Sequence, residues 1–207
     1  MSRWAEWARK LQAISQSGLH FTQDNPFEQE RYAAVRDIAA DIIAEYSNLT
    51  HEEIHNYNAT DFGYATPKVD VRGIIFQDDT VLLVREIRDQ GRWTPPGGWA
   101  DVNDAPSEAV LREVREESGY DAQVVKLLAV YDREKQGHQP SFPIHVYKLF
   151  FLCEITGGEA TPNSEADEIR FFPLDALPEL SVSRITTRQL QHFYQHLRHP
   201  DAPTEFD

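Results

Sequence analysis

The chain has 207 residues, of which 41% are hydrophobic and 26% are charged, a composition typical of folded globular domains. The 20 Lys and Arg residues stand against 34 Asp and Glu residues, and the formal net charge of −14 argues against binding to nucleic acid phosphates. No apolar run is long enough to span a bilayer, and the N-terminal segment lacks the apolar core of a signal peptide. We therefore expect a cytoplasmic protein, not bound to membranes, with one main domain and a smaller second element.

Apolar residues at helical spacing predict three helices in the first third of the chain, over residues 4–18, 26–46 and 51–58. The first helix is expected to stop at Gly18, because glycine adopts the left-handed conformation that ends many helices. Asn25 is the expected N-cap of the second helix, followed by Pro26 at its first position. Thr50 opens a capping box, Thr-His-Glu-Glu, at the start of the third helix.

From about residue 65 the pattern changes to that of a sheet. Strands are predicted over residues 69–76, 81–87, 124–131, 144–155 and 169–172, and helices over residues 106–118 and 184–197. Gly119 follows the helix 106–118 at the position where a left-handed residue ends a helix. This order predicts a mixed α/β domain over residues 65–207, preceded by a helical domain over residues 1–64.

The predicted helix 106–118 has one apolar face and one acidic face. The acidic face carries Glu113, Glu116 and Glu117 around a single Arg112. Like charges three and four residues apart repel on a helix, so a bound cation explains the cluster better than a merely solvated acidic face does. The preceding Pro-Pro-Gly-Gly sequence, residues 95–98, favours a tight loop with exposed backbone carbonyls.

Residues 98–120 resemble the Nudix box, G-x5-E-x7-R-E-U-x-E-E-x-G-U, in which U is an apolar residue. Seven positions match in register: Gly98, Arg112, Glu113, Val114, Glu116, Glu117 and Gly119. Two positions differ, because Asp104 replaces the first Glu and Tyr120 takes the last, usually aliphatic position. The helical first third and residues 63–72, 96–101 and 145–148 are similar to bacterial Nudix hydrolases of the CDP-choline pyrophosphatase type, often labelled ADP-ribose pyrophosphatases.

This resemblance implies a fold and a reaction. The implied fold is the Nudix α/β/α sandwich, with a mixed sheet between helices, behind the small helical domain. The implied reaction is the hydrolysis of a nucleoside diphosphate linked to another moiety, and the implied assembly is a homodimer formed through the N-terminal helices. The resemblance further implies that Glu113, Glu116 and Glu117, together with the carbonyl of Gly97, bind Mg²⁺, with Mn²⁺ as an alternative.

Other side chains are candidates for catalysis. Arg112 is expected to orient the carboxylates rather than to contact substrate. The general base is left open between Glu113 and an acidic residue of the segment 165–168, in which Glu168 is preferred over Glu165 and Asp167. A solvated acidic loop is the alternative interpretation of that segment.

Candidates for substrate binding lie on both predicted domains. Arg72 and Arg85 are candidates for contacts with phosphate, with ordinary ion pairs as the alternative. Trp99 and Tyr64 are candidates for stacking on a base or ribose, as is Trp93, with packing in the core as the alternative. His138 and His145 lack neighbours at zinc-like spacing and are expected to be loop and strand residues.

Two further functions compete with this prediction. An RNA end-processing Nudix hydrolase would use the same carboxylates, but the net charge argues against it. A sensor that binds ADP-ribose or a ligand related to NAD without cleaving it would usually have lost carboxylates of the box. The intact set of three favours the enzyme.

Overall fold

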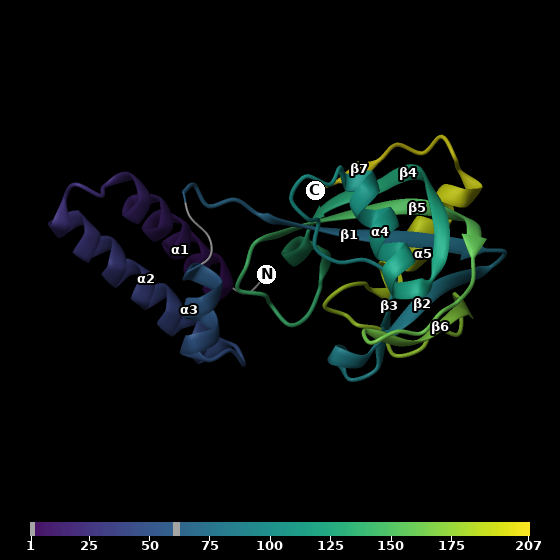
Figure 1. Cartoon of the computed structure of the whole chain (residues 1–207), viewed down its shortest axis with the longest axis horizontal. Coiled ribbons are helices and arrows are strands. Elements are labelled where there is room, and N and C mark those ends of the chain that lie inside the picture. Colours follow the sequence, from purple (N-terminus) through teal and green to yellow (C-terminus); the bar gives the residue numbers. More distant parts are fainter. Residues whose placement is uncertain (1–2, 60–62) are drawn as a thin grey trace. The chain divides into compact units, whose positions relative to one another are not determined.

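The computed structural model describes the backbone of residues 3–59 and 63–207 (Figure 1). The chain forms two compact units. One unit extends to Pro67 and includes Ser141–His145, and the other comprises Lys68–Pro140 and Val146–Asp207. The predicted domain boundary after residue 64 remains a prediction. Within the described residues, no helix is both long enough and apolar enough to cross a membrane.

The described residues of the first unit form three helices, α1 (Arg3–Phe21), α2 (Pro26–Tyr46) and α3 (His51–Ala59). The predicted stop of the first helix at Gly18 is wrong, because α1 continues for three more residues. Gly18 has a packing role: a Cβ atom there would lie 2.4 Å from ring atoms of Tyr32 on α2. The absence of a side chain at this position therefore lets the two helices approach closely.

The caps of α2 and α3 form as predicted. The side chain of Asn25 accepts hydrogen bonds from the backbone amides of Phe27 and Glu28, at 3.1 and 3.3 Å. At the start of α3, the Glu53 carboxylate accepts from the Thr50 amide at 2.8 Å, and the Thr50 hydroxyl accepts from the Glu53 amide at 3.2 Å. These contacts satisfy amides that a helix leaves without intrahelical partners.

The second unit is built on a mixed sheet of seven strands. Their bounds are β1 (Lys68–Gln77), β2 (Thr80–Glu86), β3 (Arg92–Thr94), β4 (Tyr120–Asp132), β5 (Val146–Gly158), β6 (Ala166–Pro173) and β7 (Glu205–Phe206). The spatial order is β3-β2-β1-β5-β4-β7, with β6 paired to β2. β1 is parallel to β5, and β7 is parallel to β4, whereas the other pairs are antiparallel.

Two helices cover opposite faces of this sheet, α4 (Pro106–Ser118) and α5 (Thr187–Arg198) (Figure 1). Side chains alternate between the faces along each strand. On β1, Val71 packs in the same core as Val114 of α4, whereas Ile74 packs in the same core as Phe193 of α5. The predicted α/β/α sandwich is confirmed.

The predicted elements are all present, and α2 and α4 have the predicted bounds, whereas the bounds of the others are shifted. The predicted strand 144–155 begins at Val146 and ends at Gly158, and β4 and β6 are longer than predicted. The last helix begins at Thr187 rather than at residue 184, because Thr186 and Gln189 form a capping box there. Strands β3 and β7 have three and two residues, too few for a pattern of alternation to reveal them.

Candidate metal and active site

The helix that carries the acidic face has the bounds predicted for it. α4 begins at Pro106, and the Glu108 carboxylate accepts a hydrogen bond from the Ala105 amide at 2.9 Å. It ends where Gly119, at a φ of 79°, donates its amide to the Arg115 carbonyl. Because the opposite face is anchored in the core, α4 presents its carboxylates at a fixed place beside β1.

The loop before α4 lies tightly against both β1 and α4. Gly97 has a φ of 149°, and a Cβ atom there would lie 2.1 Å from the Val71 carbonyl oxygen. The carbonyls on either side, of Pro96 and Gly98, accept hydrogen bonds from the amides of Gly73 and Val71, at 2.8 Å each. The carbonyl of Gly97 takes no part in these two bonds. No residue with a side chain fits at position 97 without moving the strand.

The three carboxylates of α4 differ in exposure. Glu117 is 7% exposed and accepts a hydrogen bond from the Gly97 amide at 2.8 Å, whereas the side chain of Glu116 is 59% exposed. Burial raises the pKa of Glu117 to about 8, against the opposing effects of Arg72 and the Gly97 amide. Burial also raises the pKa of Glu113. Two of the three carboxylates therefore lack solvation for their negative charge.

These features fit a divalent cation. A cation among the carboxylates would compensate the charge that burial makes unfavourable. The donor atoms are all oxygens, which Mg²⁺ and Mn²⁺ prefer to nitrogen or sulfur. The arrangement therefore suits the metal that the sequence predicts.

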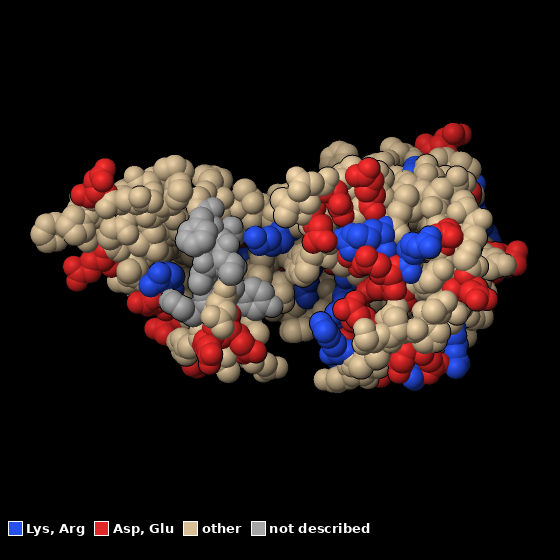
Figure 2. All heavy atoms as spheres, viewed as in Figure 1, with Lys and Arg blue, Asp and Glu red and all other residues tan. Residues whose placement is uncertain are grey.

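Arg112 lies among the acidic side chains of α4 and the loop before it. Its Nη1 atom is 3.0 Å from an oxygen of Glu113 and 3.0 Å from an oxygen of Glu116. Its Nε atom donates to Asp104 at 3.2 Å, and its Nη2 atom lies 3.3 Å from an oxygen of Asp101. Figure 2 shows this pattern of acidic side chains around basic ones over α4. Asp104, which replaces the usual Glu of the box, thus contacts the arginine of the box.

Arg72, predicted to contact substrate, is buried in the second unit and 3% exposed. Its Nε and Nη2 atoms donate to both carboxylate oxygens of Asp70, at 3.1 and 2.8 Å, and its Nη1 atom donates to the Pro95 carbonyl at 3.3 Å. Lys148 of β5 donates to the same Asp70. A direct contact between Arg72 and a phosphate would require this network to break, so the geometry favours an internal role for Arg72.

Arg85 and Glu168, predicted as a substrate contact and a general base, are paired with each other. The Arg85 Nη1 atom lies 2.6 Å from Glu168 Oε1, and its other nitrogens donate to Asp167 at 2.8 and 2.9 Å. Arg170 lies 2.5 Å from the second oxygen of Glu168. Nothing in the sequence indicated that Arg85 pairs with the segment 165–168, because the two are far apart in the chain: Arg85 and Asp167 are separated by 82 positions.

The aromatic candidates occupy different environments. Trp99 is half-exposed and its backbone bridges to Asp70 beside the site. Trp93 is buried and packs edge-on against Phe172, with ring centroids 4.7 Å apart, so it belongs to the core. Tyr64 is exposed and lies in the first unit. Its predicted role stays a prediction.

Sequence reasoning did not find the buried charges behind the site. Those that it did not name are Asp70, Glu86, Arg133, Glu134 and Lys148, and the candidate Arg72 is buried with them. Burial lowers the pKa of Lys148 to about 8, with Asp70 opposing this shift. A charged residue looks the same in the sequence whether it is buried or exposed, and its burial becomes tolerable through a charged partner, as Asp70 is for Lys148 of the neighbouring strand. The sequence therefore held no usable signal for this group.

Comparisons with known proteins agree with the geometry. The family model of the NUDIX domain matches residues 66–193, and that of the "UDP-X-like, N-terminal oligomerisation domain" matches residues 2–57. The chain is 42% identical over 206 residues, 100% of its length and 98% of the relative's, to YjhB of Bacillus subtilis (strain 168), whose name assigns it provisionally to the ADP-ribose pyrophosphatases.

Two solved structures are similar to the chain. One is an ADP-ribose pyrophosphatase from Streptococcus suis 89-1591, 40% identical, with a TM-score of 0.63, covering 69% of this chain and all of its own. The other is a UDP-X diphosphatase, 33% identical, with a TM-score of 0.63, covering 99% of this chain and 98% of its own. Together with the box on α4, these matches show that the chain belongs to the Nudix hydrolase family and carries the N-terminal domain of its UDP-X-like members.

Proposed function

We propose that this Nudix hydrolase cleaves the diphosphate of a nucleoside diphosphate linked to a second moiety, such as a sugar. The products would be a nucleoside monophosphate and the phosphorylated second moiety. The observation that carries the proposal is the partly buried cluster of Glu113, Glu116 and Glu117 on α4, held against the Gly97 loop. The names of the similar proteins, ADP-ribose pyrophosphatase and UDP-X diphosphatase, support this substrate class, and CDP-choline is a further candidate.

Mg²⁺, or Mn²⁺ in its place, would be held by the three carboxylates and the Gly97 carbonyl. When bound, the cation offsets the charge of the diphosphate oxygens and makes water a better nucleophile. The Gly97 amide fixes one oxygen of Glu117, which leaves the other oxygen for the cation. Arg112 holds Glu113 and Glu116 on the same side of the helix, so that their carboxylates do not move apart by repulsion.

A base must accept the proton of the attacking water, and Glu113 and Glu168 are the two candidates. Both oxygens of Glu168 are paired with arginines, so Glu168 would have to release one of them before it could accept a proton. Glu113 pairs with an arginine through Oε1 alone, so its second oxygen could accept the proton if Glu116, Glu117 and the Gly97 carbonyl held the cation. We therefore favour Glu113 and expect E113Q to remove the acidic limb of the pH–rate profile, which E168Q would leave in place.

The N-terminal helices form the contact of a homodimer. On α1, the apolar side chains of Trp7, Ile14 and Phe21 are exposed and recur every seven residues, which places them on one stripe. Exposed apolar stripes of this kind mark contacts with another protein surface. The match of residues 2–57 to an oligomerisation domain supports the same role.

The test is a comparison of substrates with a matched pair of variants. The purified chain is incubated with Mg²⁺ and ADP-ribose, a UDP-sugar, CDP-choline, NAD-capped RNA or a nucleoside triphosphate, and the products are identified by chromatography. E116Q is expected to lower kcat by on the order of a hundredfold, the effect of removing one electrostatic group from an active site. E108Q, on the same helix, keeps an acceptor for the Ala105 amide and is expected to retain activity.

Each outcome decides between the candidate functions. Cleavage of a diphosphate-linked nucleoside that E116Q loses and E108Q keeps would support the proposal, and the preferred substrate would give the specificity. Preferred cleavage of capped RNA would favour the RNA end-processing function. Tight binding of ADP-ribose without turnover by the unmodified chain would favour a sensor.

A further inference from the structure

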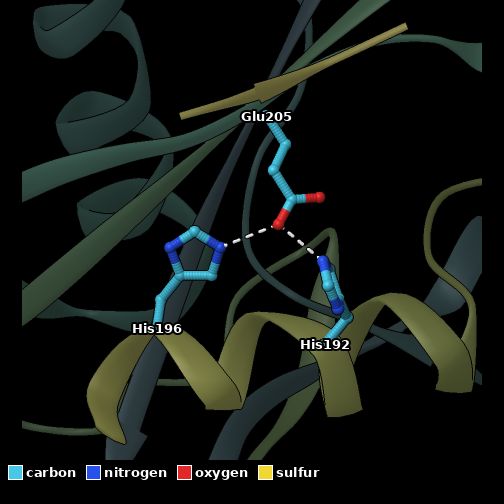
Figure 3. A group of neighbouring side chains, drawn as sticks. All are labelled: His192, His196 and Glu205. Carbon is cyan, nitrogen blue, oxygen red and sulfur yellow. Dashed lines mark hydrogen bonds and ion pairs between the residues drawn. The ribbon is translucent and has the colours of Figure 1, made fainter. Parts of the chain in front are cut away.

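A second cluster of ligand-type side chains lies at the C-terminal end of the chain, on the face of the sheet opposite α4 (Figure 3). His192 and His196 are four residues apart on α5 and therefore share one face of that helix. Their Nε2 atoms lie 2.5 and 3.0 Å from the same oxygen, Oε1 of Glu205 on β7. All three ligand atoms lie within 4.8 Å of one another. Figure 3 shows the two rings facing this oxygen.

The carboxylate of Glu205 is held in place by other contacts. The Tyr131 hydroxyl of β4 donates to its second oxygen, Oε2, at 2.6 Å. Strand β7 pairs with β4, with Glu205 opposite Ala129. The Thr204 hydroxyl donates to the Leu127 carbonyl at 2.7 Å. These contacts direct Oε1 toward the two histidines. Residues hydrogen-bonded to a metal ligand orient that ligand in the same way.

The two histidines differ in exposure in a way that suits a metal site open on one side. The side chain of His196 is 3% exposed, and within the described residues its Nδ1 atom has no hydrogen-bond partner, so its ring is held through Nε2. The side chain of His192 is 51% exposed and can turn without disturbing the core. An ion would thus reach the cluster from solvent on the side of His192.

Two imidazole nitrogens and one carboxylate oxygen form a ligand set that suits Zn²⁺ and similar divalent transition metals. Metal–ligand distances of about 2.0–2.2 Å separate the ligand atoms of a tetrahedral ion by roughly 3.4 Å. The present separations of 2.5 and 3.0 Å from Oε1 require shifts of less than about 1 Å, which the exposed His192 can supply. The three residues leave at least one coordination position for water.

We propose that His192, His196 and Glu205 form a second metal site, for Zn²⁺ or a similar transition metal, independent of the carboxylates on α4. The metal links α5 to β7 and so fastens the C-terminal segment to the sheet. The two sites differ in chemistry, because the site on α4 offers only oxygen atoms, whereas this one offers two nitrogens.

The experiment is a Zn²⁺ titration of the full-length chain by isothermal titration calorimetry, with excess Mg²⁺ present to occupy the carboxylates on α4. One Zn²⁺ is expected to bind to the unmodified chain. H192A should weaken this binding by at least about tenfold, whereas H199A, an exposed histidine at the end of the same helix, should leave it unchanged. Y131F, which keeps the ring but loses the contact to Glu205, should weaken it by roughly 10- to 100-fold.

Cobalt provides an independent readout of the ligand set. Co²⁺ at this site should give the visible absorption bands of a four-coordinate ion with nitrogen ligands, and H192A should remove them. Circular dichroism of H192A verifies that the variant is folded. Equal Zn²⁺ binding by the unmodified chain and H192A, or no Zn²⁺ binding by the unmodified chain, would overturn the proposal. The histidines would then serve only as hydrogen-bond donors to Glu205.

Discussion

Asp70 is a buried carboxylate between two buried cations, Arg72 and Lys148, and their positive charges hold the pKa of Asp70 well below its usual range. Removing the charge of Asp70 leaves both cations without the buried carboxylate to which they donate hydrogen bonds. We therefore expect D70N to lower the free energy of unfolding by about 3–5 kcal/mol, measured by urea denaturation. D167N removes a similar two-point pair with Arg85, but at the surface, and should cost less than about 1 kcal/mol. Equal losses in the two variants would contradict this account.

The same carboxylate is connected to the site through Arg72. Asp70 fixes the guanidinium in place, and the charge of Arg72 lowers the pKa of Glu117 against the effect of burial. The ionised form of Glu117 is the one that binds a cation. The buried pair thus favours the charge state that the metal site needs, without any contact to substrate.

His138 predicts a dependence of stability on pH. Its Nδ1 atom donates to the Val182 carbonyl at 3.0 Å, and the Gln189 amide donates to its Nε2 atom at 3.3 Å, since the oxygen of that amide already accepts from Thr186. Burial, reinforced by the charge of Lys148, lowers the pKa of His138 to about 3. The folded chain therefore keeps His138 neutral where the unfolded chain protonates it.

The sign follows from the protons bound in each state. Below about pH 6.5 the unfolded chain binds a proton at His138 that the folded chain does not, so stability falls as the pH falls toward 3. The slope is at most about 1.4 kcal/mol per pH unit for this group. We expect urea denaturation between about pH 7 and pH 5 to show a shallower loss for H138Q than for the unmodified chain or H199Q. Parallel curves for all three proteins would rule out His138 as the cause.

At the scale of elements, the contact between α4 and β1 sets the position of the carboxylates. A Cβ atom at Gly73 of β1 would lie 2.5 Å from Cγ2 of Val114 on α4. We expect G73A to push the helix away from the strand, to cost about 1–3 kcal/mol of unfolding free energy, and to lower kcat more than it changes KM. G157A, whose Cβ atom would be 3.6 Å from Asp121, should change stability by less than about 0.5 kcal/mol.

Denaturation curves and steady-state kinetics of the two glycine variants provide the measurement. A loss of stability in G73A with unchanged kcat would show that the carboxylates tolerate a displacement of α4. That result would weaken the link between this contact and catalysis, while leaving the packing argument intact.

At the scale of the whole molecule, the exposed stripe on α1 predicts a self-association that one charge can disrupt. We expect sedimentation velocity to show a dimer for the unmodified chain and a monomer for I14E, because a carboxylate in an apolar contact loses its solvation. V125E places the same charge on an equally exposed apolar position of β4 and should remain a dimer. Dissociation of V125E but not of I14E would show that the dimer contact lies on the second unit and not on α1.

Local signals in the sequence determined much of the fold and the main site. Asn25 and Thr50 cap their helices as predicted, and Pro106 and Gly119 mark both ends of α4. The spacing of the acidic residues on α4, with the glycines that flank them, is enough to indicate the family. These features depend on residues close together in the chain, so the sequence contains all the information that they require.

The tertiary structure alone decided which charges are free and which are paired. Arg72 shares the buried carboxylate of Asp70 with Lys148 of β5, and Arg85 binds Glu168 on a distant strand. Gly18 lies within α1, where the absence of a side chain leaves room for the ring of Tyr32 on α2. In the same way, His192 and His196 acquire Glu205 only when β7 pairs with β4. Each of these outcomes depends on two segments that are distant in the sequence and meet in the fold. Whether a charge can be buried, or a gap filled, depends on a side chain of the other segment, which the local sequence does not contain.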